Sequence, residues 1–391
     1  MKYPLASSTW DEKEISAIQR VIDSDMYSMG NEVSSFEEEY AEYIGSKYAV
    51  MTSSGSTANL LMIASMFYTS DESLRLERGD EIIVPAVSWS TTYFPLQQYG
   101  LKVKFVDICR ETLNIDINQL KSAITEKTRA ILAVNLLGNP NDFNHILELA
   151  SSNNITLLED NCESLGAKYN NKLTGTFGLM GTFSSFFSHH ISTMEGGMVA
   201  TDNEELYHIL LTLRAHGWTR NLPYKNHVTG IKSKNEFEES FKFVLPGYNV
   251  RPLEMSGAIG REQLKKLDSF IRERRTNAEK FINHFKEHEF INIQKEIGES
   301  SWFGFSLVLK DGNLKSRDKL IKILKDNNID CRPIVTGNFV KNKKVLKYFD
   351  YEIHNELINS NYIDQHGLFV GNHHVKIFEE IEYLHDVIKK F

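Results

Sequence analysis

Apolar residues near the start of the chain recur with the period of an amphipathic helix. Isoleucines stand at positions 15, 18 and 22, which places them on one face of a helix. Thr9 comes before this run and Glu12 follows it three positions later, in the pattern of a capping box. We therefore expect a first helix that runs to about Ser24 and packs on the large domain. A second helix is expected over residues 35–44, where Gly45 would end it.

The following part of the chain alternates between two kinds of segment. Short apolar runs of strand length occupy residues 47–56, 80–86, 102–108, 129–138 and 154–161. Segments with helical periodicity lie between them, at residues 57–68, 89–100, 117–124 and 144–152. Strands that alternate with helices predict βαβ units and a parallel sheet. In such a sheet ligands bind beyond the carboxyl ends of the strands, which is where the motifs described below lie.

The stretch at residues 181–197, GTFSSFFSHHISTMEGG, combines features of a strand and a turn. Its apolar, hydroxyl-bearing first half predicts a buried strand, and two adjacent histidines, His189 and His190, follow on a short turn. A helix is expected over residues 204–217. Residues 218–243 are polar without any periodicity, and so long a stretch in a compact enzyme is usually a functional loop or an oligomer contact.

The last part of the chain predicts a second, smaller domain. Residues 244–285 read as a polar loop and then a long helix, which we expect to bridge the two domains. Beyond it, strand-like and helical segments alternate again up to a final helix over residues 379–391. The expected fold is α/β, with a large domain of mostly parallel sheet at residues 1–250 and a smaller C-terminal α/β domain at residues 251–391.

Composition and charge narrow the classes of function. The 391 residues are 41% hydrophobic and 25% charged, as in ordinary soluble proteins, and the net charge of −8 comes without a basic stripe. Nucleic acid is therefore not an expected partner. The N-terminus lacks the apolar core of a signal peptide, and the longest apolar runs fall well short of the ~20 residues of a membrane-spanning helix. We expect a soluble, cytoplasmic protein that contacts no membrane.

The three cysteines, Cys109, Cys162 and Cys331, lie far apart in the sequence. An odd number without CxxC spacing indicates neither a disulfide framework nor a zinc or iron–sulfur site. No metal is expected, and a reducing compartment suits the protein best.

Three motifs could carry chemistry, and each has a structural alternative. Residues 53–57, SSGST, stand between an expected strand and helix, where backbone amides and Gly55 could hold an anion; helix capping is the alternative. Asp160 and Glu163 follow a strand, where a carboxylate could pair with a protonated ring nitrogen or cap the next turn. Trp89 could stack on a flat ring or belong to the core.

The histidine pair allows two interpretations as well. Adjacent histidines in an apolar context are more often structural or hydrogen-bonded than catalytic. A metal would need further ligands at suitable spacing, and the sequence offers none that we can identify. Catalysis by His189 therefore depends on the context supplied by the other motifs.

Five motifs follow one another along the large domain: SSGST, VPAVSWSTT, EDNCESLGAKYNNKLTGTFG, FSSFFSHHISTMEGGMVATD and LPGYNVRPLEMSGAIG. In this order they resemble the DegT/DnrJ/EryC1/StrS family of nucleotide-sugar aminotransferases, which are fold type I pyridoxal phosphate enzymes. Because five ordered motifs match, the resemblance is highly specific. It implies the aminotransferase fold for the large domain and a cofactor site at the ends of its strands.

The resemblance also implies a role for each matching residue. The cofactor-binding set would comprise Gly55, Ser56, Trp89, Asp160, Glu163, Ser184, Ser188 and Asn249. The glycine and the three serines would bind the phosphate, the tryptophan would cover the ring face, and the aspartate would pair with the pyridine nitrogen. The asparagine, in the PGYN loop, would reach a phosphate in the partner subunit of a homodimer with shared active sites.

His189 stands where the family aminotransferases carry the lysine that binds the cofactor covalently. Lysine there forms a Schiff base and also moves protons, and imidazole can do only the second. We therefore expect pyridoxal or pyridoxamine phosphate to be bound non-covalently. A histidine near its ordinary pKa of roughly 6.5 would suit a group that first removes a proton and then donates one. Lys168 and Lys172 are near in sequence but stand in a polar turn, which makes them poor substitutes.

The resemblance extends through GYNVRP, RPIVTGNF and FVGNH to members of the family that carry this histidine. They remove the 3-hydroxyl of a GDP-linked 4-keto-6-deoxy sugar and release ammonia, and L-glutamate restores pyridoxamine phosphate. Candidates for binding the sugar, its pyrophosphate or glutamate are His216, Arg220 and Arg251, because guanidinium groups bind such anions bidentately. A helix-end histidine and surface arginines are the structural alternatives.

Other functions stay open at this point. Histidine-bearing relatives that need an iron–sulfur cluster require four ligands, which three cysteines cannot supply. A conventional sugar aminotransferase would need a lysine at or beside position 189. A non-catalytic, cofactor-binding protein is the third class, although the retained Asp160, Trp89 and Ser184 would then lack a purpose.

Overall fold

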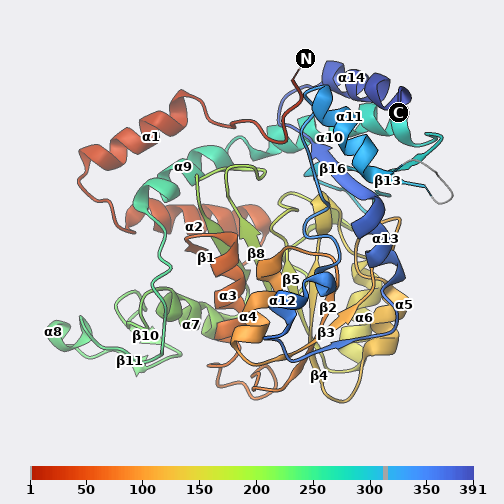
Figure 1. Ribbon diagram of the computed structural model, residues 1–391. Coiled ribbons are helices and arrows are strands. Elements are labelled where there is room, and N and C mark those ends of the chain that lie inside the picture. The colour runs from red at the N-terminus through yellow and green to blue at the C-terminus, as the bar shows by residue number, and fades with distance from the viewer. Residues whose placement is uncertain (1, 311–315) are drawn as a thin grey trace.

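A sheet of eight strands forms the centre of the computed structural model, which describes residues 2–310 and 316–391 (Figure 1). The strand order is β1-β9-β8-β5-β4-β2-β3-β15. The strands are β1 (Tyr48–Thr52), β2 (Glu81–Pro85), β3 (Lys102–Val106), β4 (Thr128–Val134), β5 (Thr156–Asp160), β8 (Met180–Ser184), β9 (Gly197–Thr201) and β15 (Tyr351–Ile353). Every neighbouring pair is parallel except the two that include β9. The expected large, mostly parallel sheet is confirmed.

Helices cover both faces of this sheet because successive side chains of a strand point to opposite sides. Ile82 and Val84 of β2 belong to the same core as α3, α4 and α7, whereas Ile83 between them packs with α5 and α6. These helices are α3 (Gly55–Ser65), α4 (Ser90–Gln98), α5 (Ile117–Ala123), α6 (Phe143–Ser152) and α7 (Glu204–Arg214). The carboxyl ends of the parallel strands stay free of helices, and the loops there carry the candidate motifs.

The first helix begins differently from the prediction. Helix α1 spans Glu12–Asp23 and its N-cap is Asp11, whose side chain accepts a hydrogen bond from Lys13 N while Glu14 binds back to the Asp11 backbone. The predicted capping box of Thr9 and Glu12 is therefore wrong. The end near Ser24 is confirmed, because that residue is the C-cap.

Helix α2 (Asn31–Ile44) starts earlier than residue 35 and ends as expected at Gly45, which adopts a left-handed conformation with φ of +75°. It packs on the β1–β9–β8 edge of the sheet. Helix α1 lies against α9 (Glu254–Leu264), where Ala17 and Val21 meet Ala258. The sequence predicted packing on the large domain; the partner helix α9 lies just beyond the predicted boundary at residue 250 and packs in turn on α2.

A second sheet, with the order β12-β13-β16-β14, forms the smaller α/β unit. Its antiparallel strands are β12 (Ile291–Asn292), β13 (Gly304–Leu309), β14 (Cys331–Arg332) and β16 (Gly367–Gly371). The helices α10 (Leu267–Phe285), α11 (Arg317–Asp326) and α14 (Phe378–Lys389) pack on it. The stacked rings of Phe281 and Phe305, with centroids 4.2 Å apart, lie at the centre of this core.

Both ends of the chain cross between the two sheets. Tyr3 is buried in the core of the smaller unit, where its hydroxyl donates to the Gly371 carbonyl at 2.7 Å. In the other direction, η2 (Phe339–Lys341), α12 (Lys343–Leu346) and β15 return to the large sheet before α13 (Ile358–His366) leads back. The domain boundary at residue 250 stays a prediction.

The polar stretch at residues 218–243 contains short elements that its sequence did not predict. A hairpin of β10 (Lys225–Asn226) and β11 (Gly230–Ile231) precedes the four-residue helix α8 (Glu236–Glu239). In Figure 1 this stretch projects from the large domain at the lower left. A second hairpin, β6 (Lys168–Tyr169) and β7 (Lys172–Leu173), and the turn η1 (Leu136–Gly138) complete the structure.

The described residues show neither a membrane span nor a metal cluster. No helix in residues 2–310 and 316–391 has the length and apolarity to cross a bilayer. Within the same residues, no three side chains of the metal-binding types come together to hold an ion. The cysteines Cys109, Cys162 and Cys331 are free thiols.

Candidate active site

Asp160 lies where the parallel strands end, as the last residue of β5. Its side chain is buried, and Oδ2 accepts hydrogen bonds from Thr92 Oγ1 at 2.7 Å and Asn59 Nδ2 at 2.9 Å. Oδ1 accepts from Cys162 N at 3.2 Å, so the aspartate also makes the turn-capping contact that was the structural alternative. The three donors fix the carboxylate and leave it facing the space beyond the strand.

The SSGST motif joins β1 to α3 and acts in part as a helix cap. Ser54 accepts from Thr57 N at 3.2 Å in a capping box, as the structural alternative proposed. Gly55 has a packing reason of its own, because a Cβ there would lie 2.7 Å from Ser184 Cβ. The first amides of a helix have no partner within the helix, so the N-terminus of α3 can still bind an anion. Ser56 donates to Thr91 Oγ1 at 2.9 Å.

Trp89 is not a core residue, since 57% of its side chain is exposed. It precedes α4, the helix that also supplies Thr92 to Asp160. The adjacent Ser88 carbonyl accepts a hydrogen bond from Thr336 Oγ1 at 2.6 Å, which brings the RPIVTGNF loop of the smaller unit to the same edge of the sheet. The tryptophan is therefore free to cover a flat ring.

Glu163 is held close to Asp160 by the turn after β5. Its Oε2 accepts from Leu137 N at 3.0 Å, and Leu137 has a left-handed φ of +53°. Burial, with a further contribution from the charge of Asp160, raises the pKa of Glu163 to about 7. A carboxyl group with such a pKa can donate as well as accept a hydrogen bond near neutral pH.

The histidines lie in a compact loop between β8 and β9, at residues 185–196. Backbone hydrogen bonds close the loop, from Ser185 N to the Gly196 carbonyl at 2.9 Å and from Phe187 N to the Met194 carbonyl at 3.1 Å. Ser184, at the end of β8, precedes the loop, and Ser188 lies within it, partly exposed. The His189 amide donates to the Phe186 carbonyl at 2.9 Å.

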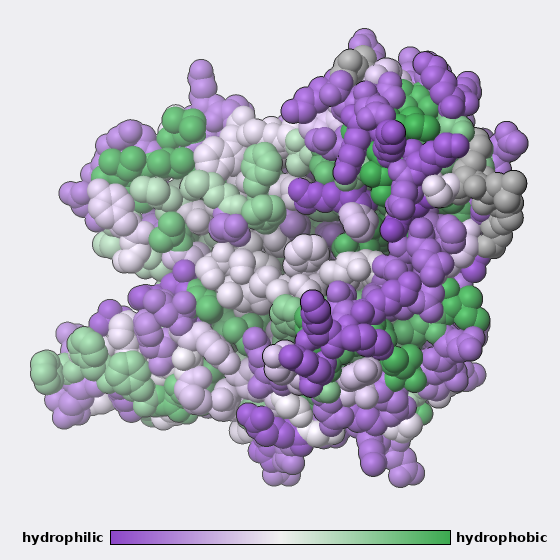
Figure 2. Space-filling view, in the orientation of Figure 1, coloured by the Kyte–Doolittle hydropathy of each residue, from purple (hydrophilic) through white to green (hydrophobic). Residues whose placement is uncertain are grey.

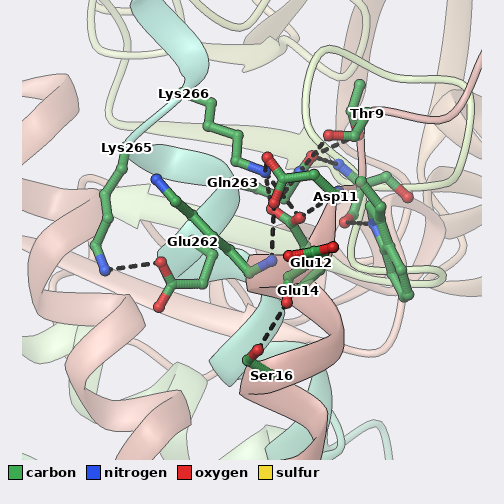
Figure 3. Close-up of polar contacts among 12 residues, drawn as sticks. Thr9, Asp11, Glu12, Glu14, Ser16, Glu262, Gln263, Lys265 and Lys266 are labelled. Atoms are coloured by element: carbon green, nitrogen blue, oxygen red, sulfur yellow. Dashed lines mark hydrogen bonds and ion pairs between the residues drawn. The ribbon is translucent and has the colours of Figure 1, made fainter.

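Contacts between the N-terminal segment and helix α9 support this loop from outside. Figure 3 shows Gln263 between Thr9 and Glu14, with Lys266 reaching toward Glu14. Gln263 Oε1 accepts from Thr9 Oγ1 at 2.6 Å and from Ser192 N at 3.0 Å. The Trp10 indole N–H donates to the Ser192 carbonyl at 2.9 Å. Thr9, which the sequence suggested as a cap, instead supports the histidine loop.

The two histidines differ in their surroundings. His189 is partly exposed, although its Nδ1 is buried without a hydrogen-bond partner among the described residues. His190 is buried, and its ring Nε2 lies 3.2 Å from the Ser301 carbonyl. The structural interpretation therefore suits His190, whereas His189 is open to a ligand.

The pKa of His189 departs from the expectation of an ordinary value. Burial and the nearby positive charge of Arg274 lower this pKa to about 4, although a hydrogen bond with the Phe186 carbonyl acts to raise it. Because the neutral ring predominates at neutral pH, His189 is ready to accept a proton. Once protonated it is a stronger acid than an ordinary imidazolium.

The remaining predicted residues form a second group on the other side of α3. His216, with φ of +61°, and Arg220 flank Trp218, whose ring lies 4.9 Å from the His216 ring and 4.7 Å from the Arg220 guanidinium carbon. The Arg251 side chain donates from Nε to Asn249 Oδ1 at 3.0 Å. Asn249 and Arg220 are both exposed, so this group faces away from the chain's own body.

One backbone contact connects the two groups. Ser53 N donates to the Val250 carbonyl at 3.0 Å, which ties the PGYN loop to the SSGST motif. The structure thus brings Gly55, Ser56, Asp160, Glu163 and Ser184 together with the histidine loop. It leaves the side chains of His216, Arg220, Asn249 and Arg251 at the exposed rim.

Several contributors carried no local signal in the sequence. Asn59 and Thr92 orient Asp160 but read as ordinary residues of helices α3 and α4. Phe303 packs on His189 with ring centroids 5.2 Å apart, and Arg274 stands behind it. Long-range contacts of this kind follow from the packing of the two sheets.

A pyridoxal or pyridoxamine phosphate would fit this donor set. The buried carboxylate of Asp160 suits a protonated ring nitrogen, and the N-terminus of α3 with Ser184 suits a phosphate. The two lysines considered as substitutes have other contacts. Lys172 Nζ lies 4.9 Å from the centroid of the Phe177 ring, and the Lys168 backbone pairs with Glu299.

Comparisons with known proteins agree with this arrangement. The model of the DegT/DnrJ/EryC1/StrS aminotransferase family matches residues 8–386. A GDP-4-keto-6-deoxy-D-mannose 3-dehydratase of Yersinia pseudotuberculosis is 66% identical over 390 residues, which cover 100% of this chain and 99% of the relative.

Solved structures give the same result. A GDP-4-keto-6-deoxymannose-3-dehydratase, in a histidine-to-asparagine variant with bound GDP-perosamine, is 64% identical with a TM-score of 0.98, and covers 99% of this chain and 100% of that one. Another structure of a GDP-4-keto-6-deoxymannose-3-dehydratase contains a trapped PLP-glutamate geminal diamine. It is 64% identical with a TM-score of 0.97, over 99% of this chain and 100% of that one.

Proposed function

Because the chain belongs to the DegT/DnrJ/EryC1/StrS aminotransferase family, we propose that it is a pyridoxal phosphate-dependent dehydratase of a nucleotide sugar. The substrate is GDP-4-keto-6-deoxy-D-mannose, and the products are GDP-4-keto-3,6-dideoxy-D-mannose and ammonia. L-glutamate restores the pyridoxamine form of the cofactor. The proposal rests on His189, which the family resemblance puts at the position of the aminotransferase lysine, and on the buried Asp160 at the end of β5, the strand that pairs with β8, which leads into the histidine loop.

When bound, pyridoxamine phosphate supplies the amino group that condenses with the sugar ketone and a ring that accepts electrons. The residues of this chain do the rest. Asp160 keeps the ring nitrogen protonated, and Trp89 shields one face of the ring. His189 cannot hold the cofactor covalently, so it acts only on protons: it removes one from the exocyclic carbon and delivers one to the departing 3-hydroxyl.

The low pKa of His189 keeps its ring neutral for the first step and makes the imidazolium a strong acid for the second, while it also makes the neutral ring a weaker base. A neutral ring is required for the first, and its Nδ1 has no competing partner among the described residues. The imidazolium formed in the first step then gives up its proton readily to the hydroxyl. One residue thereby takes over the part of the lysine in proton transfer, whereas the aminotransferase alternative needs a covalent link that histidine cannot form.

The exposed rim supplies the substrate contacts in this proposal. Arg220 and Arg251 bind the carboxylates of glutamate or the pyrophosphate of the sugar nucleotide. His216 touches the sugar, positioned by its contact with Trp218. These side chains are exposed or partly exposed in a single chain. Such exposure accords with an active site that a second chain completes.

A homodimer with shared active sites follows from the apolar surface. In Figure 2 hydrophobic side chains gather over α1 at the upper left and over α8 with the β10–β11 hairpin at the lower left. The exposed apolar side chains of these parts include Ile15, Ile22, Tyr27, Ile231, Phe237, Phe241 and Phe243. Contiguous apolar surface of this kind marks a protein interface, and it flanks the loop from which Asn249 reaches the partner's phosphate site.

The proposed product places the protein in the cytoplasm, where GDP-sugars are made and consumed. A GDP-linked 3,6-dideoxy sugar serves the O-antigen of lipopolysaccharide, with colitose as the end product. A relative of 31% identity over 373 residues bears the name of a lipopolysaccharide biosynthesis protein, which supports this setting.

The test is an assay with pyridoxal phosphate, L-glutamate and GDP-4-keto-6-deoxy-D-mannose, in which ammonia and the product mass are followed. We expect ammonia and a product lighter by one oxygen from the unmodified enzyme, and loss or diversion of this reaction in His189→Lys. An amino sugar without ammonia from the unmodified enzyme would contradict the proposal and establish a transaminase.

A further inference from the structure

Arg274, in helix α10, is a buried cation without an ion-pair partner in the described part of the chain. Only 4% of its surface is exposed, and burial lowers its pKa to about 10. Its Nη1 donates to three main-chain carbonyls: Asn372 at 2.9 Å, Phe303 at 3.1 Å and Trp302 at 3.4 Å. Burying a charge without an anionic partner costs free energy. A functional role for Arg274 would account for this cost.

Two of the three carbonyls that Arg274 binds, those of Trp302 and Phe303, belong to the segment that contacts the histidine loop. The Phe303 ring lies 5.2 Å from the His189 ring and 5.8 Å from the His190 ring. The Ser301 carbonyl is 3.2 Å from His190 Nε2. Segment 301–303 is therefore sandwiched between Arg274 on one side and the two histidines on the other.

This segment has little freedom to move. Trp302 adopts a left-handed φ of +49°, and a Cβ on Gly138 would lie only 2.4 Å from Trp302 N. Phe303 N donates to the Leu137 carbonyl at 3.1 Å. Asn372 Nδ2 adds hydrogen bonds to the carbonyls of Trp302 at 2.8 Å and Arg274 at 3.0 Å. Because the Arg274 guanidinium binds this segment and the Phe303 ring of the segment packs on His189, Arg274 can influence the orientation of the His189 ring.

The charge of Arg274 acts on a whole group of histidines. The pKa of His189, His373 and His374 falls to about 4, and that of His190 falls well below its ordinary value; burial is the first cause in each and Arg274 the second. His189 further lowers the pKa of His190, and the positive charge of Lys266 further lowers the pKa of His374. No carboxylate is among the causes that act on His189.

We propose that Arg274 is a positioning residue for His189: its guanidinium holds segment 301–303, and with it the Phe303 ring that packs against the His189 ring. Its positive charge, which no carboxylate of the described residues pairs with, acts on His189 across this segment. The inference rests on the proposed function of His189. It explains why the buried Arg274 is surrounded by main-chain carbonyls and by no carboxylate of the described residues.

The test compares Arg274→Met, which removes the charge, with Arg274→Lys, which keeps it. Arg275→Met is a matched control, because Arg275 is the next residue of α10 and also binds main-chain carbonyls, yet it pairs with Glu299 at 3.0 Å and faces outward. The His189 titration is measured by NMR on protein labelled with ¹³C-histidine, and His189→Asn assigns its signal. This readout needs no catalysis.

We expect Arg274→Met to move the His189 titration midpoint upward by about half a pH unit or more. The acidic limb of kcat/KM should move in the same direction, while Arg274→Lys and Arg275→Met leave both near the values of the unmodified protein. An unmoved midpoint in Arg274→Met, or an equal shift in Arg274→Lys, would overturn the proposal. If the unmodified protein released no ammonia, the proposed function would fail, but the NMR comparison would still decide the influence of Arg274 on His189.

Discussion

The ring of Phe303 meets the ring of His189 edge to face, with centroids 5.2 Å apart and planes inclined by 60°. Phe303 precedes β13 of the smaller unit, and His189 belongs to a loop of the large domain. The proposed catalytic ring is thus held by a side chain from the other sheet. Its orientation depends on how the two units pack.

Phe303→Ala should therefore lower kcat without a matching loss of cofactor binding. Removal of the ring leaves the imidazole free to turn, and misorientation of a proton-transfer group by a fraction of an ångström costs about tenfold or more in rate. The measurement is steady-state release of ammonia, beside a fluorescence titration with pyridoxal phosphate.

Phe303→Leu, which keeps an apolar group of similar reach, serves as the control and should lose less. An unchanged kcat in Phe303→Ala would show that the edge-to-face contact does not orient His189.

Thr92 should matter for the cofactor because its hydroxyl donates to Asp160 at 2.7 Å. Thr92→Val keeps the shape but removes this donor, and a hydrogen bond to a charged group contributes about 1.5–3 kcal/mol. We expect about tenfold weaker binding of pyridoxal phosphate, measured by equilibrium titration. Thr92→Ser retains the hydroxyl and should bind nearly as well as the unmodified protein; equal weakening in both variants would contradict this account.

The raised pKa of Glu163 should make the free energy of unfolding depend on pH. Its pKa is raised to about 7 in the folded protein, above the value of an exposed glutamate, so the folded state binds the extra proton between those two pH values. Stability from this group is therefore present at low pH and lost as the pH rises through 7.

Glu163→Gln keeps an acceptor for Leu137 N but cannot ionise. Relative to the unmodified protein, its free energy of unfolding should gain about 2–3 kcal/mol between pH 5 and pH 8, which urea denaturation at the two pH values measures. A difference that stays constant with pH would mean that Glu163 has an ordinary pKa in the folded state.

The sequence predicted those parts of the fold that local patterns determine. Short apolar runs identified most strands of the large sheet, and Gly45 marked the end of α2. The edge strand β15 was missed, because its three residues lie far along the chain, in the part assigned to the smaller domain. The start of α1 was ambiguous because two capping patterns overlap there, one from Thr9 to Glu12 and one from Asp11 to Glu14. The contact between Thr9 and Gln263, residues 254 positions apart, decides between them.

The same limit applies to the site. The cofactor-binding residues around Asp160 belong to short motifs at the strand ends, so they could be predicted from the sequence. The surroundings of His189 come from Arg274 and Phe303, which lie far along the chain on another sheet. Because no local pattern encodes their approach, the low pKa of His189 could not be predicted from the sequence.

A shared active site makes a prediction that a mixture of two inactive variants can check. In the proposed homodimer His189 acts in one chain, while Asn249 reaches the phosphate bound by the partner. A mixed dimer of His189→Asn and Asn249→Asp chains then contains one site with both lesions and one site with neither. Random pairing makes half of the dimers mixed, so activity should recover to about a quarter of the unmodified level.

The two variants are co-expressed with different tags and purified separately and together, and ammonia release is compared. If each site were built from a single chain, every site in the mixture would carry one lesion and no activity would return. Recovery therefore requires that Asn249 acts across the interface. Ile15→Asp and Phe237→Asp, on the two exposed apolar surfaces, should abolish both the recovery and the dimer seen by analytical ultracentrifugation, because a buried charge there opposes association.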